Sequence, residues 1–408
     1  MSRVTTSCSA IALWLLLSAA AAAQISQASP LPLFPVLPAW NEPLDRLLTA
    51  PPGFAGPHAF LATDDDRFTA LDLVTGQPAW SVAGTPVSAP ASGDGLVFLA
   101  ERGRLTAVRQ ADGTVAWQLP FTEPLAVPLT WDNGWLVGAD AAGTVFAFRA
   151  TDGELIWRRE LGAPVHAPPA LAADRVYIGL EDGRVVALDV TTGQERWSRQ
   201  LGGPPNEMLA LDDRIYVGSD DNYLYCLLAG PGDIDWRWRT GGDVIGQPLV
   251  DDSRVYFVSR DNVLRALDRR SGAQRWKRAL ASRPTRGPVR AGDVLLVSGL
   301  TPKVYAFAMK DGTPAGDIAA PGELAASPFV LTVHGLPQVV LVSRDLARGT
   351  RVLAMRRLID PPMNTPLPVL PGVITVTVPG ATAASPTPSL QPLVPPVAPP
   401  AGSAPPRR

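Results

Sequence analysis

Histidine and cysteine are scarce in this sequence, which has three of the first and two of the second in 408 residues. His58, His166 and His334 are far apart and lack the close spacing that metal ligands usually show. Cys8 falls in an N-terminal leader, so Cys226 remains alone and an internal disulfide is excluded from the mature chain. Ser-His-Asp patterns, phosphate-binding loops and zinc motifs are also missing, so these classes of site have no support.

Net charge and long apolar runs are scarce as well. A formal net charge of −2 provides no general attraction to nucleic acid or anionic lipid. One apolar run, residues 11–22, follows Arg3 and leads into three alanines before Gln24, which is typical of a secretory signal peptide. We therefore predict that residues 1–23 are removed and that the mature chain has no membrane span. Acylation is not expected, because Cys8 precedes the apolar run.

One pattern, Gly-x-x-x-Trp, is abundant and evenly spaced. Its copies are Gly76/Trp80, Gly113/Trp117, Gly153/Trp157, Gly193/Trp197, Gly232/Trp236 and Gly272/Trp276. A seventh copy at Gly312 has Gly316 in place of the tryptophan. The position numbers of successive glycines differ by 37, 40, 40, 39, 40 and 40. A period this regular indicates a repeat architecture.

Each repeat predicts four short strands. In residues 175–197, strands at 176–179 and 184–189 flank a turn at 181–183, and a second turn at 192–193 leads into a strand that contains Trp197. An earlier apolar strand is expected before each such hairpin. Examples are residues 86–90, 125–129, 165–171, 244–250 and 325–330. Four strands in about 40 residues are typical of a β-propeller blade.

The two ends of the repeat region complement each other. Trp40 lies one full period before Trp80, although Val36 stands where the preceding glycine would be. The last repeat has a hairpin within residues 339–355 but no Gly-x-x-x-Trp. We predict that the strand around Trp40 completes the blade begun at residues 329–355, which removes an open sheet edge. The chain is thus predicted to be an all-β, eight-bladed propeller over residues 36–360, with seven blades as the alternative.

A second column of residues supports the alignment. A small residue lies six positions before each repeat glycine, and these residues are Ala70, Ala107, Ala147, Ala187, Cys226, Ala266 and Ala306, with Ala354 in the last hairpin. Small residues suit close packing, so Cys226 is predicted to be a buried, inert thiol. The tryptophan rings are expected to fill the space between neighbouring blades, and the repeat glycines to need a positive φ.

The segments outside the propeller are rich in proline. Residues 24–35 are predicted to be extended. Residues 361–408 hold 15 prolines and no charged residue before Arg407, so we predict a disordered tail with polyproline-II character.

The repeat Gly-x-(Val/Leu)-x-Ala-(Leu/Phe)-Asp-x-x-(Thr/Asp)-Gly-x-x-x-Trp resembles the PQQ-type, or quinoprotein-like, propeller repeat. The family has a catalytic branch of quinoprotein dehydrogenases and a non-catalytic, BamB-like branch that serves outer-membrane protein assembly. Length, blade number and the predicted secretion signal resemble the second branch. The missing lipid-attachment cysteine and the proline-rich tail depart from it.

The resemblance to the dehydrogenases would imply a PQQ cofactor and a Ca²⁺ ion. Ca²⁺ needs several oxygen ligands, and the alcohol dehydrogenases add an adjacent cysteine pair that this chain lacks. Asp220, Asp221, Asn222, Asp261 and Asn262 fall in hairpin turns, where turn chemistry explains them without a metal. We therefore expect no catalytic, cofactor-binding or metal-binding residues.

Charge is uneven along the repeats. The fifth predicted blade is acidic, and the stretch after it is rich in arginine between Arg254 and Arg290. One interpretation is a solvated surface with ion pairs between blades. The other is a docking patch for an acidic partner, carried by Arg269, Arg270, Lys277 and Arg278.

These observations together predict a non-catalytic scaffold for other envelope proteins, with a role in outer-membrane protein assembly. We expect it to be periplasmic or secreted, associated with the outer membrane, and a monomer within a larger complex. Two alternatives stay open: a PQQ-dependent dehydrogenase, and a module that senses a small molecule in the channel of the propeller.

Overall fold

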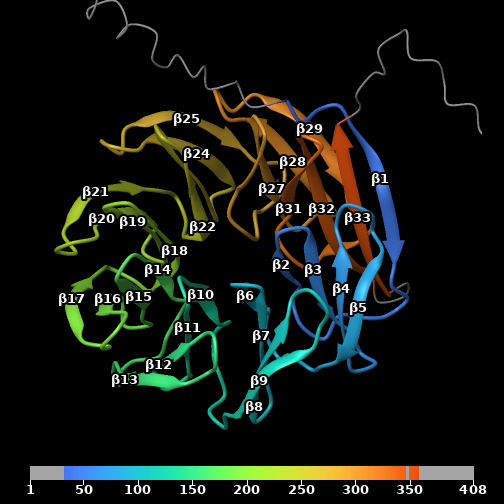
Figure 1. The fold of residues 1–408 in the computed structure, drawn as a ribbon. Helices are drawn as coiled ribbons and strands as arrows, with labels where there is room; N and C mark the ends of the chain where they lie inside the picture. Colours follow the sequence, from blue (N-terminus) through green and yellow to red (C-terminus); the bar gives the residue numbers. More distant parts are fainter. Residues whose placement is uncertain (1–31, 346–348, 358–408) are drawn as a thin grey trace, which may run out of the picture. The chain divides into compact units, whose positions relative to one another are not determined.

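The computed structural model describes residues 32–345 and 349–357 of the chain. All the regular secondary structure in this part is β-strand, arranged as eight antiparallel sheets around a centre (Figure 1). The prediction of an eight-bladed propeller is therefore confirmed. No described helix is long and apolar enough to cross a bilayer. The predicted signal peptide, most of residues 24–35 and the tail at 361–408 lie outside the described residues.

The first four blades follow one another along the chain, and each has four strands. Blade 1 comprises β2 (Gly53–Ala55), β3 (His58–Ala62), β4 (Arg67–Asp72) and β5 (Pro78–Ala83). Blade 2 comprises β6 (Ala91–Gly93), β7 (Leu96–Glu101), β8 (Arg104–Arg109) and β9 (Val115–Pro120). Blade 3 comprises β10 (Thr130–Asp132), β11 (Trp135–Ala139), β12 (Thr144–Arg149) and β13 (Leu155–Glu160). Blade 4 comprises β14 (Ala170–Ala172), β15 (Arg175–Gly179), β16 (Arg184–Asp189) and β17 (Glu195–Gln200).

The next three blades repeat this plan, and the eighth modifies it. Blade 5 comprises β18 (Pro205–Leu211), β19 (Arg214–Ser219), β20 (Tyr223–Leu228) and β21 (Ile234–Arg239). Blade 6 comprises β22 (Val244–Val250), β23 (Arg254–Ser259), β24 (Val263–Asp268) and β25 (Gln274–Ala279). Blade 7 comprises β26 (Val289–Ala291), β27 (Val294–Ser298), β28 (Lys303–Ala308) and β29 (Pro314–Ala319). Blade 8 comprises β30 (Glu323–Leu324), β31 (Phe329–Val333), β32 (Leu336–Asp345), β33 (Gly349–Arg357) and the N-terminal β1 (Val36–Pro43).

Within each blade the strands follow one another in order from the centre of the propeller outward, and we call them strands a to d. Strands such as β6, β10, β14 and β18 lie near the centre, whereas β17 and β21 lie at the outer edge (Figure 1). Because consecutive strands are antiparallel, the turns between b and c lie on the same face as the connections from d to the next a. We call this the connection face. The other face carries the a–b and c–d turns and is called the turn face.

The ring closes as predicted, because the N-terminal strand completes the last blade. Strand β1 pairs antiparallel with β33, and Trp40 lies opposite Ala354. The two pairing strands lie side by side in Figure 1 although they come from opposite ends of the described chain. The eighth blade therefore does not leave β33 as an open edge.

The predicted positions of several a strands were only partly right. Strands were expected at 86–90, 125–129 and 165–171, but the structure has Ala91–Gly93, Thr130–Asp132 and Ala170–Ala172. Strand a of blade 8 likewise begins at Phe329 instead of residue 325. The earlier residues form the d–a connections, whose apolar side chains, such as Val127 and Val165, are buried. Pro86, Leu125 and Val165 each form a single antiparallel β-bridge at the end of strand b of the blade, so these runs pair with the sheet at isolated points before the continuous a strands begin. Strand β22, in contrast, occupies the predicted residues 244–250.

The repeated tryptophans join each blade to the next one. In all seven cases the indole Nε1 donates a hydrogen bond to a backbone carbonyl in the next blade's c–d turn, at 2.7–3.2 Å. The donor–acceptor pairs are Trp40–Leu73, Trp80–Gln110, Trp117–Ala150, Trp157–Val190, Trp197–Ala229, Trp236–Arg269 and Trp276–Met309. Each ring thus packs between two blades and also satisfies its polar N–H group.

The glycine of each c–d turn is needed for two reasons. Gly193 has a φ of +68°, which residues other than glycine rarely adopt. A Cβ atom at Gly193 would also lie only 2.7 Å from the ring of Trp157. The other six repeat glycines show the same positive φ and the same close approach to the preceding tryptophan. The predicted positive φ is confirmed, and contact with the ring is a second constraint that the sequence did not reveal.

The small residues of strand c lie directly opposite the tryptophans of strand d. Ala187 pairs with Trp197, and Cys226 pairs with Trp236. Ala306 pairs with Gly316, which stands where the tryptophan is missing. All the small residues in this column are buried.

Residues near the N-terminus replace the missing tryptophan between blades 7 and 8. We call the interface between two neighbouring blades a seam. A Cβ atom at Gly316 would lie 2.7 Å from the ring of Phe34, so this ring occupies the space beside the glycine. Leu33 is fully buried in the same cluster of apolar side chains. The guanidinium of Arg357 donates hydrogen bonds to the carbonyl oxygens of Pro32 and Phe34, at 2.7 and 3.1 Å.

Candidate docking surface

The four basic residues singled out in the sequence all belong to blade 6, and we call them the blade-6 patch. Arg269 and Arg270 lie in the turn after β24, on the turn face, and Lys277 and Arg278 lie on the outer strand β25. Arg270 and Lys277 are exposed, whereas Arg269 and Arg278 are half-buried. The four residues therefore share one corner of the propeller but differ in their surroundings.

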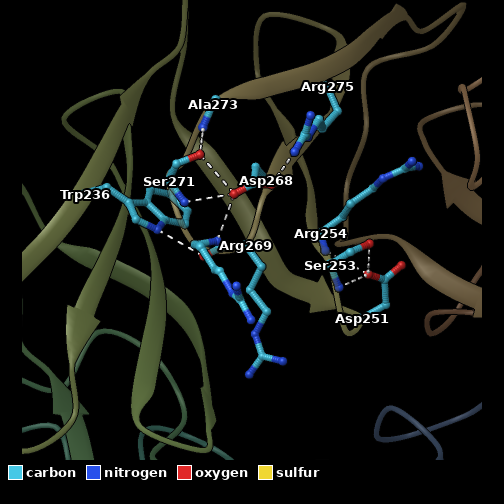
Figure 2. A network of polar contacts seen from close by, with 10 residues as sticks. Trp236, Asp251, Ser253, Arg254, Asp268, Arg269, Ser271, Ala273 and Arg275 are labelled. Atoms are coloured by element: carbon cyan, nitrogen blue, oxygen red, sulfur yellow. Dashed lines mark hydrogen bonds and ion pairs between the residues drawn. The ribbon is translucent and has the colours of Figure 1, made fainter.

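Asp268 organises the turn that carries Arg269 and Arg270 (Figure 2). Its Oδ1 accepts hydrogen bonds from the backbone N–H groups of Arg270 and Ser271 and from the Ser271 hydroxyl. Its Oδ2 accepts a hydrogen bond from Arg275 at 2.5 Å. The guanidinium of Arg275, followed by the hydrogen bonds from Ser271, holds the pKa of the Asp268 carboxyl well below its usual range. This carboxylate therefore stays ionised and fixes the turn.

Two members of the blade-6 patch contact neighbouring blades. Arg269 donates to the Asp212 carboxylate and to the Tyr216 hydroxyl, both in blade 5. Arg278 donates to the carbonyl oxygens of Asp311 and Gly312 in blade 7. The hydrogen bond to Asp212, followed by that to Tyr216, raises the pKa of Arg269. Arg269 therefore stabilises the seam between blades 5 and 6, and Arg278 the seam between blades 6 and 7. The contact of Arg269 with Asp212 agrees with the interpretation that charge in this region forms ion pairs between blades.

The other two members have free charged groups. Within the described residues, neither the Arg270 guanidinium nor the Lys277 ammonium makes a side-chain hydrogen bond or ion pair. Both are exposed, so they are available to an acidic partner without breaking a contact inside the protein. Of the four residues of the blade-6 patch, only Arg270 and Lys277 therefore keep a charged group that is free to contact a partner.

A second arginine of blade 6 also reaches the next blade. Arg254 donates to the carbonyl oxygens of Met309 and Lys310, each at 2.7 Å. Its backbone N–H and that of Ser253 are bound by Asp251, so the a–b turn is fixed (Figure 2). Two arginines of blade 6, Arg254 and Arg278, therefore stabilise the seam with blade 7.

The outer strands of the ring differ in charge. Strands β13, β17, β21 and β25 each contain two or three basic residues, whereas β5 and β9 contain no charged residue. Charged side chains on an edge strand oppose pairing with another strand. Blades 3 to 6 therefore present a basic rim, and blades 1 and 2 a neutral one.

A polar cluster on the connection face was missed in the sequence. The amide Nδ2 of Asn206 donates to Asp220 Oδ1 and to the carbonyl of Val244, each at 2.8 Å. His166 Nε2 lies 3.8 Å from Asp220 Oδ2. His166 and Asn206 lie one period apart and so occupy the same position in consecutive repeats, a signal that could have paired them. Asp220 lies in the turn region that the sequence predicted, but it also contacts His166 of blade 4, and its partner Asn206 contacts Val244 of blade 6.

The remaining candidates for chemistry are dispersed. Cys226 is fully buried, and burial raises the pKa of its thiol to about 12. His58 lies 3.3 Å from the Gln110 amide, and His334 occupies an a–b turn with a φ of +51°. No group of three or more His, Cys, Asp or Glu residues in the described ranges is arranged to hold a metal ion.

Comparison with known families supplies what the geometry alone does not. The family model described as outer membrane protein assembly factor BamB matches residues 37–128, 101–212, 208–312 and 263–345. The chain belongs to this family. The overlapping matches cover nearly the whole propeller, so the resemblance seen in the repeat is confirmed.

Individual relatives are distant from the chain. The outer membrane protein assembly factor BamB of Moranella endobia (strain PCIT) is 31% identical over 103 residues. That match includes 22% of this chain and spans only 26% of the relative's length.

Solved structures support the fold. BamB from Moraxella catarrhalis is 18% identical with a TM-score of 0.63, covering 78% of this chain and 97% of that one. Quinohemoprotein alcohol dehydrogenase from Comamonas testosteroni is 13% identical with a TM-score of 0.62, covering 80% and 77%. Saccharomyces cerevisiae Sqt1 is 13% identical with a TM-score of 0.65, covering 78% and 98%. Because proteins with such different names share the fold, structural likeness alone does not identify a function.

Proposed function

We propose that this protein is a non-catalytic scaffold of the cell envelope that takes part in the assembly of outer-membrane proteins. The observation that carries the proposal is the match of the BamB family model from residue 37 to residue 345. The predicted signal peptide of this protein supports a periplasmic location at the outer membrane. The protein would act as a monomer within a larger complex of envelope proteins.

The structure offers features that suit a scaffold. Seven tryptophan contacts and several arginine contacts connect the blades, so loops on both faces are held on a stiff frame. Arg270 and Lys277 offer two exposed positive charges on the same blade. We propose that these two residues contact an acidic surface of a partner, with Arg269 and Arg278 positioning the turn and strand that carry them.

In-cell crosslinking tests this role. The tagged, mature protein is crosslinked in living cells, and the trapped proteins are identified by mass spectrometry. We expect components of the outer-membrane barrel assembly machinery to dominate. If these components are absent while other proteins are trapped reproducibly, the assembly role is wrong.

Charge reversal tests the blade-6 patch separately. The double variant Arg270→Glu with Lys277→Glu should reduce the crosslinked yield several-fold, because two attractive contacts become repulsive. The double variant Arg109→Glu with Arg159→Glu is the control, since both residues are exposed on other blades and carry the same total charge change. Equal yields from the patch variant and the wild-type protein would show that blade 6 is not the docking surface.

We also propose that the protein binds no quinone cofactor. The dispersed positions of the candidate ligand residues in the described ranges support this view. Titration with PQQ and Ca²⁺ should leave the Tm unchanged and produce no dye reduction. A Tm that rises only when both are present would instead support the dehydrogenase alternative.

A further inference from the structure

Blade 2 is shorter than its neighbours on the connection face. Phe98 of strand b lies opposite the small residue Ala107 of strand c. It follows Trp80, the tryptophan of the preceding blade, by 18 positions, whereas the equivalent residues of five other blades follow their tryptophans by 20. The b–c turn is also one residue shorter. Phe98 pairs with Ala107, nine positions later, whereas the equivalent paired residues of blades 1 and 3–7 are ten positions apart. These three missing residues account for the repeat spacing of 37 instead of 40 between Gly76 and Gly113. Both shortened segments lie on the same face.

Two adjoining hollows occur where these residues are missing. One, of about 440 Å³, is lined by Thr49, Asp66, Thr85, Pro86, Val87 and Arg102. The other, of about 420 Å³, extends from Val87 and Arg102 to Phe121 and Leu125. Val87 and Arg102 line both hollows, so the two adjoin across blades 1 to 3. We call these two adjoining hollows together the blade-2 notch.

The floor of the notch is apolar and partly uncovered. Val87 is 50% exposed, so part of its side chain is open to solvent at the notch. Phe121 and Leu105 also line the notch, and both are almost fully buried. The floor therefore offers a hydrophobic contact that no described part of the chain covers.

The charged groups at the rim of the notch differ in whether they are paired. Glu101 is buried and accepts hydrogen bonds from Arg104, Thr106 and the backbone N–H of Thr85, so its charge is satisfied. Asp66 and Arg102, in contrast, make no side-chain hydrogen bond or ion pair within the described residues. Both are exposed, and they lie on the rim of the same hollow.

We propose that the blade-2 notch binds an extended segment of a partner protein that carries an aliphatic or aromatic side chain next to charged residues of both signs. The apolar side chain would pack on Val87 and Phe121. A basic residue of the segment would pair with Asp66, and an acidic residue with Arg102. This chemistry matches an apolar floor flanked by one free anion and one free cation. The proposal rests on the scaffold role proposed above and adds a site separate from blade 6.

The experiment uses random dodecapeptides displayed on phage and selected on the immobilised mature chain. Selected peptides are synthesised with a fluorescent label, and their Kd values are measured by anisotropy. We expect a shared pattern of one large apolar residue flanked by a basic and an acidic residue. Val87→Asp should raise the Kd at least about tenfold, because it places a charge on the apolar floor. Arg102→Glu should favour peptides in which the acidic residue is replaced by lysine.

The matched control is Val115→Asp. Val115 is 60% exposed on the outer strand β9 of the same blade, so the substitution is chemically identical but outside the notch. We expect no change in Kd for this variant. Circular dichroism and Tm values for all variants separate loss of binding from loss of folding.

Three results would overturn the proposal. One is a selection without peptides above background, and another is an equal Kd for the wild-type protein and Val87→Asp. The third is binding only after deletion of residues 358–408, since the tail of this chain would then be the natural occupant. Failure of the assembly role is distinguishable, because it would appear in crosslinking while peptide binding to the notch remained.

Discussion

Seven of the eight seams between blades are built alike, and the eighth is built differently. In each of the seven, a tryptophan ring packs on the glycine of the next blade's c–d turn and donates to a carbonyl of the same turn. In the eighth, Gly316 replaces the tryptophan and Phe34 packs against it from the other end of the chain. Local repetition thus builds seven seams, and a contact between distant segments builds the last.

The difference teaches how a repeat protein closes. A repeat can supply identical seams only while a next repeat follows it, so the last seam must use the chain's other end. The N-terminal segment does this twice, because β1 completes the sheet of blade 8 and Phe34 fills the seam beside blade 7. We therefore expect the repeated seams to respond alike to substitution and the eighth to respond separately.

The largest effect is expected at a repeated seam. Trp157→Ala should lower the free energy of unfolding by about 3–5 kcal/mol, because it removes a buried ring between blades 3 and 4. Trp157→Phe keeps most of the ring and loses the hydrogen bond to Val190, so it should cost about 1 kcal/mol for the lost bond and somewhat more for the lost volume. Urea denaturation measures both values. Equal losses in the two variants would mean that the hydrogen bond, and not the packing, holds the seam.

A smaller effect is expected at the eighth seam. Phe34→Ala should cost about 2 kcal/mol, since the Phe34 ring is only partly buried. Gly316→Trp alone should also destabilise, because the new ring would occupy the space of Phe34 and because Gly316 has a φ of +149°.

The double variant sharpens this comparison. Phe34→Ala combined with Gly316→Trp should lose less stability than the sum of the two single variants, because the tryptophan gains the space that the phenylalanine vacates. The three variants and the wild-type protein form a double-mutant cycle in urea. Simple additivity of the two losses would show that Phe34 does not replace the missing tryptophan.

The smallest effect concerns pH at the connection face of the seam between blades 5 and 6. Asp261 accepts hydrogen bonds from Arg265, from Ser259 and from the backbone N–H of Gly241 in the preceding connection. Burial alone would raise the pKa of the Asp261 carboxyl, but these hydrogen bonds outweigh it and lower the pKa to about 2. Because the folded pKa is below the unfolded value, the stabilisation is present above about pH 4 and is lost as the pH falls towards 2.

Substitution isolates this carboxylate. Asp261→Asn should flatten the dependence of the unfolding free energy on pH between about 4 and 2, where the wild-type protein loses roughly 1–2 kcal/mol through this group once screening by solvent is allowed for. Glu323→Gln in blade 8 is the control, since its ion pair with Arg344 is exposed and should matter little. A wild-type slope that persists in Asp261→Asn would assign the acid sensitivity to other carboxylates.

The sequence predicted the repeated features well because they depend on short-range spacing. The Trp and Gly columns, the small residues opposite the tryptophans and the closure by Trp40 all follow from the regular period of the repeat. It placed the a strands only partly, because buried apolar residues such as Val165 bridge the end of strand b at a single point in the connection before the continuous strand begins. For the blade-6 patch, the sequence offered ion pairs between blades as one interpretation, but it did not identify Arg269 and Arg278 as the residues that contact blades 5 and 7.

The amino-acid sequence by itself determined the all-β class, the number of blades and the order in which they close, since each depends on patterns that recur along the chain. Only the tertiary structure decided which basic side chains remain free, how Phe34 replaces a tryptophan, and where three missing residues leave the blade-2 notch. Those features arise between segments far apart in sequence, where packing and the pairing of charges depend on distances that no linear pattern contains.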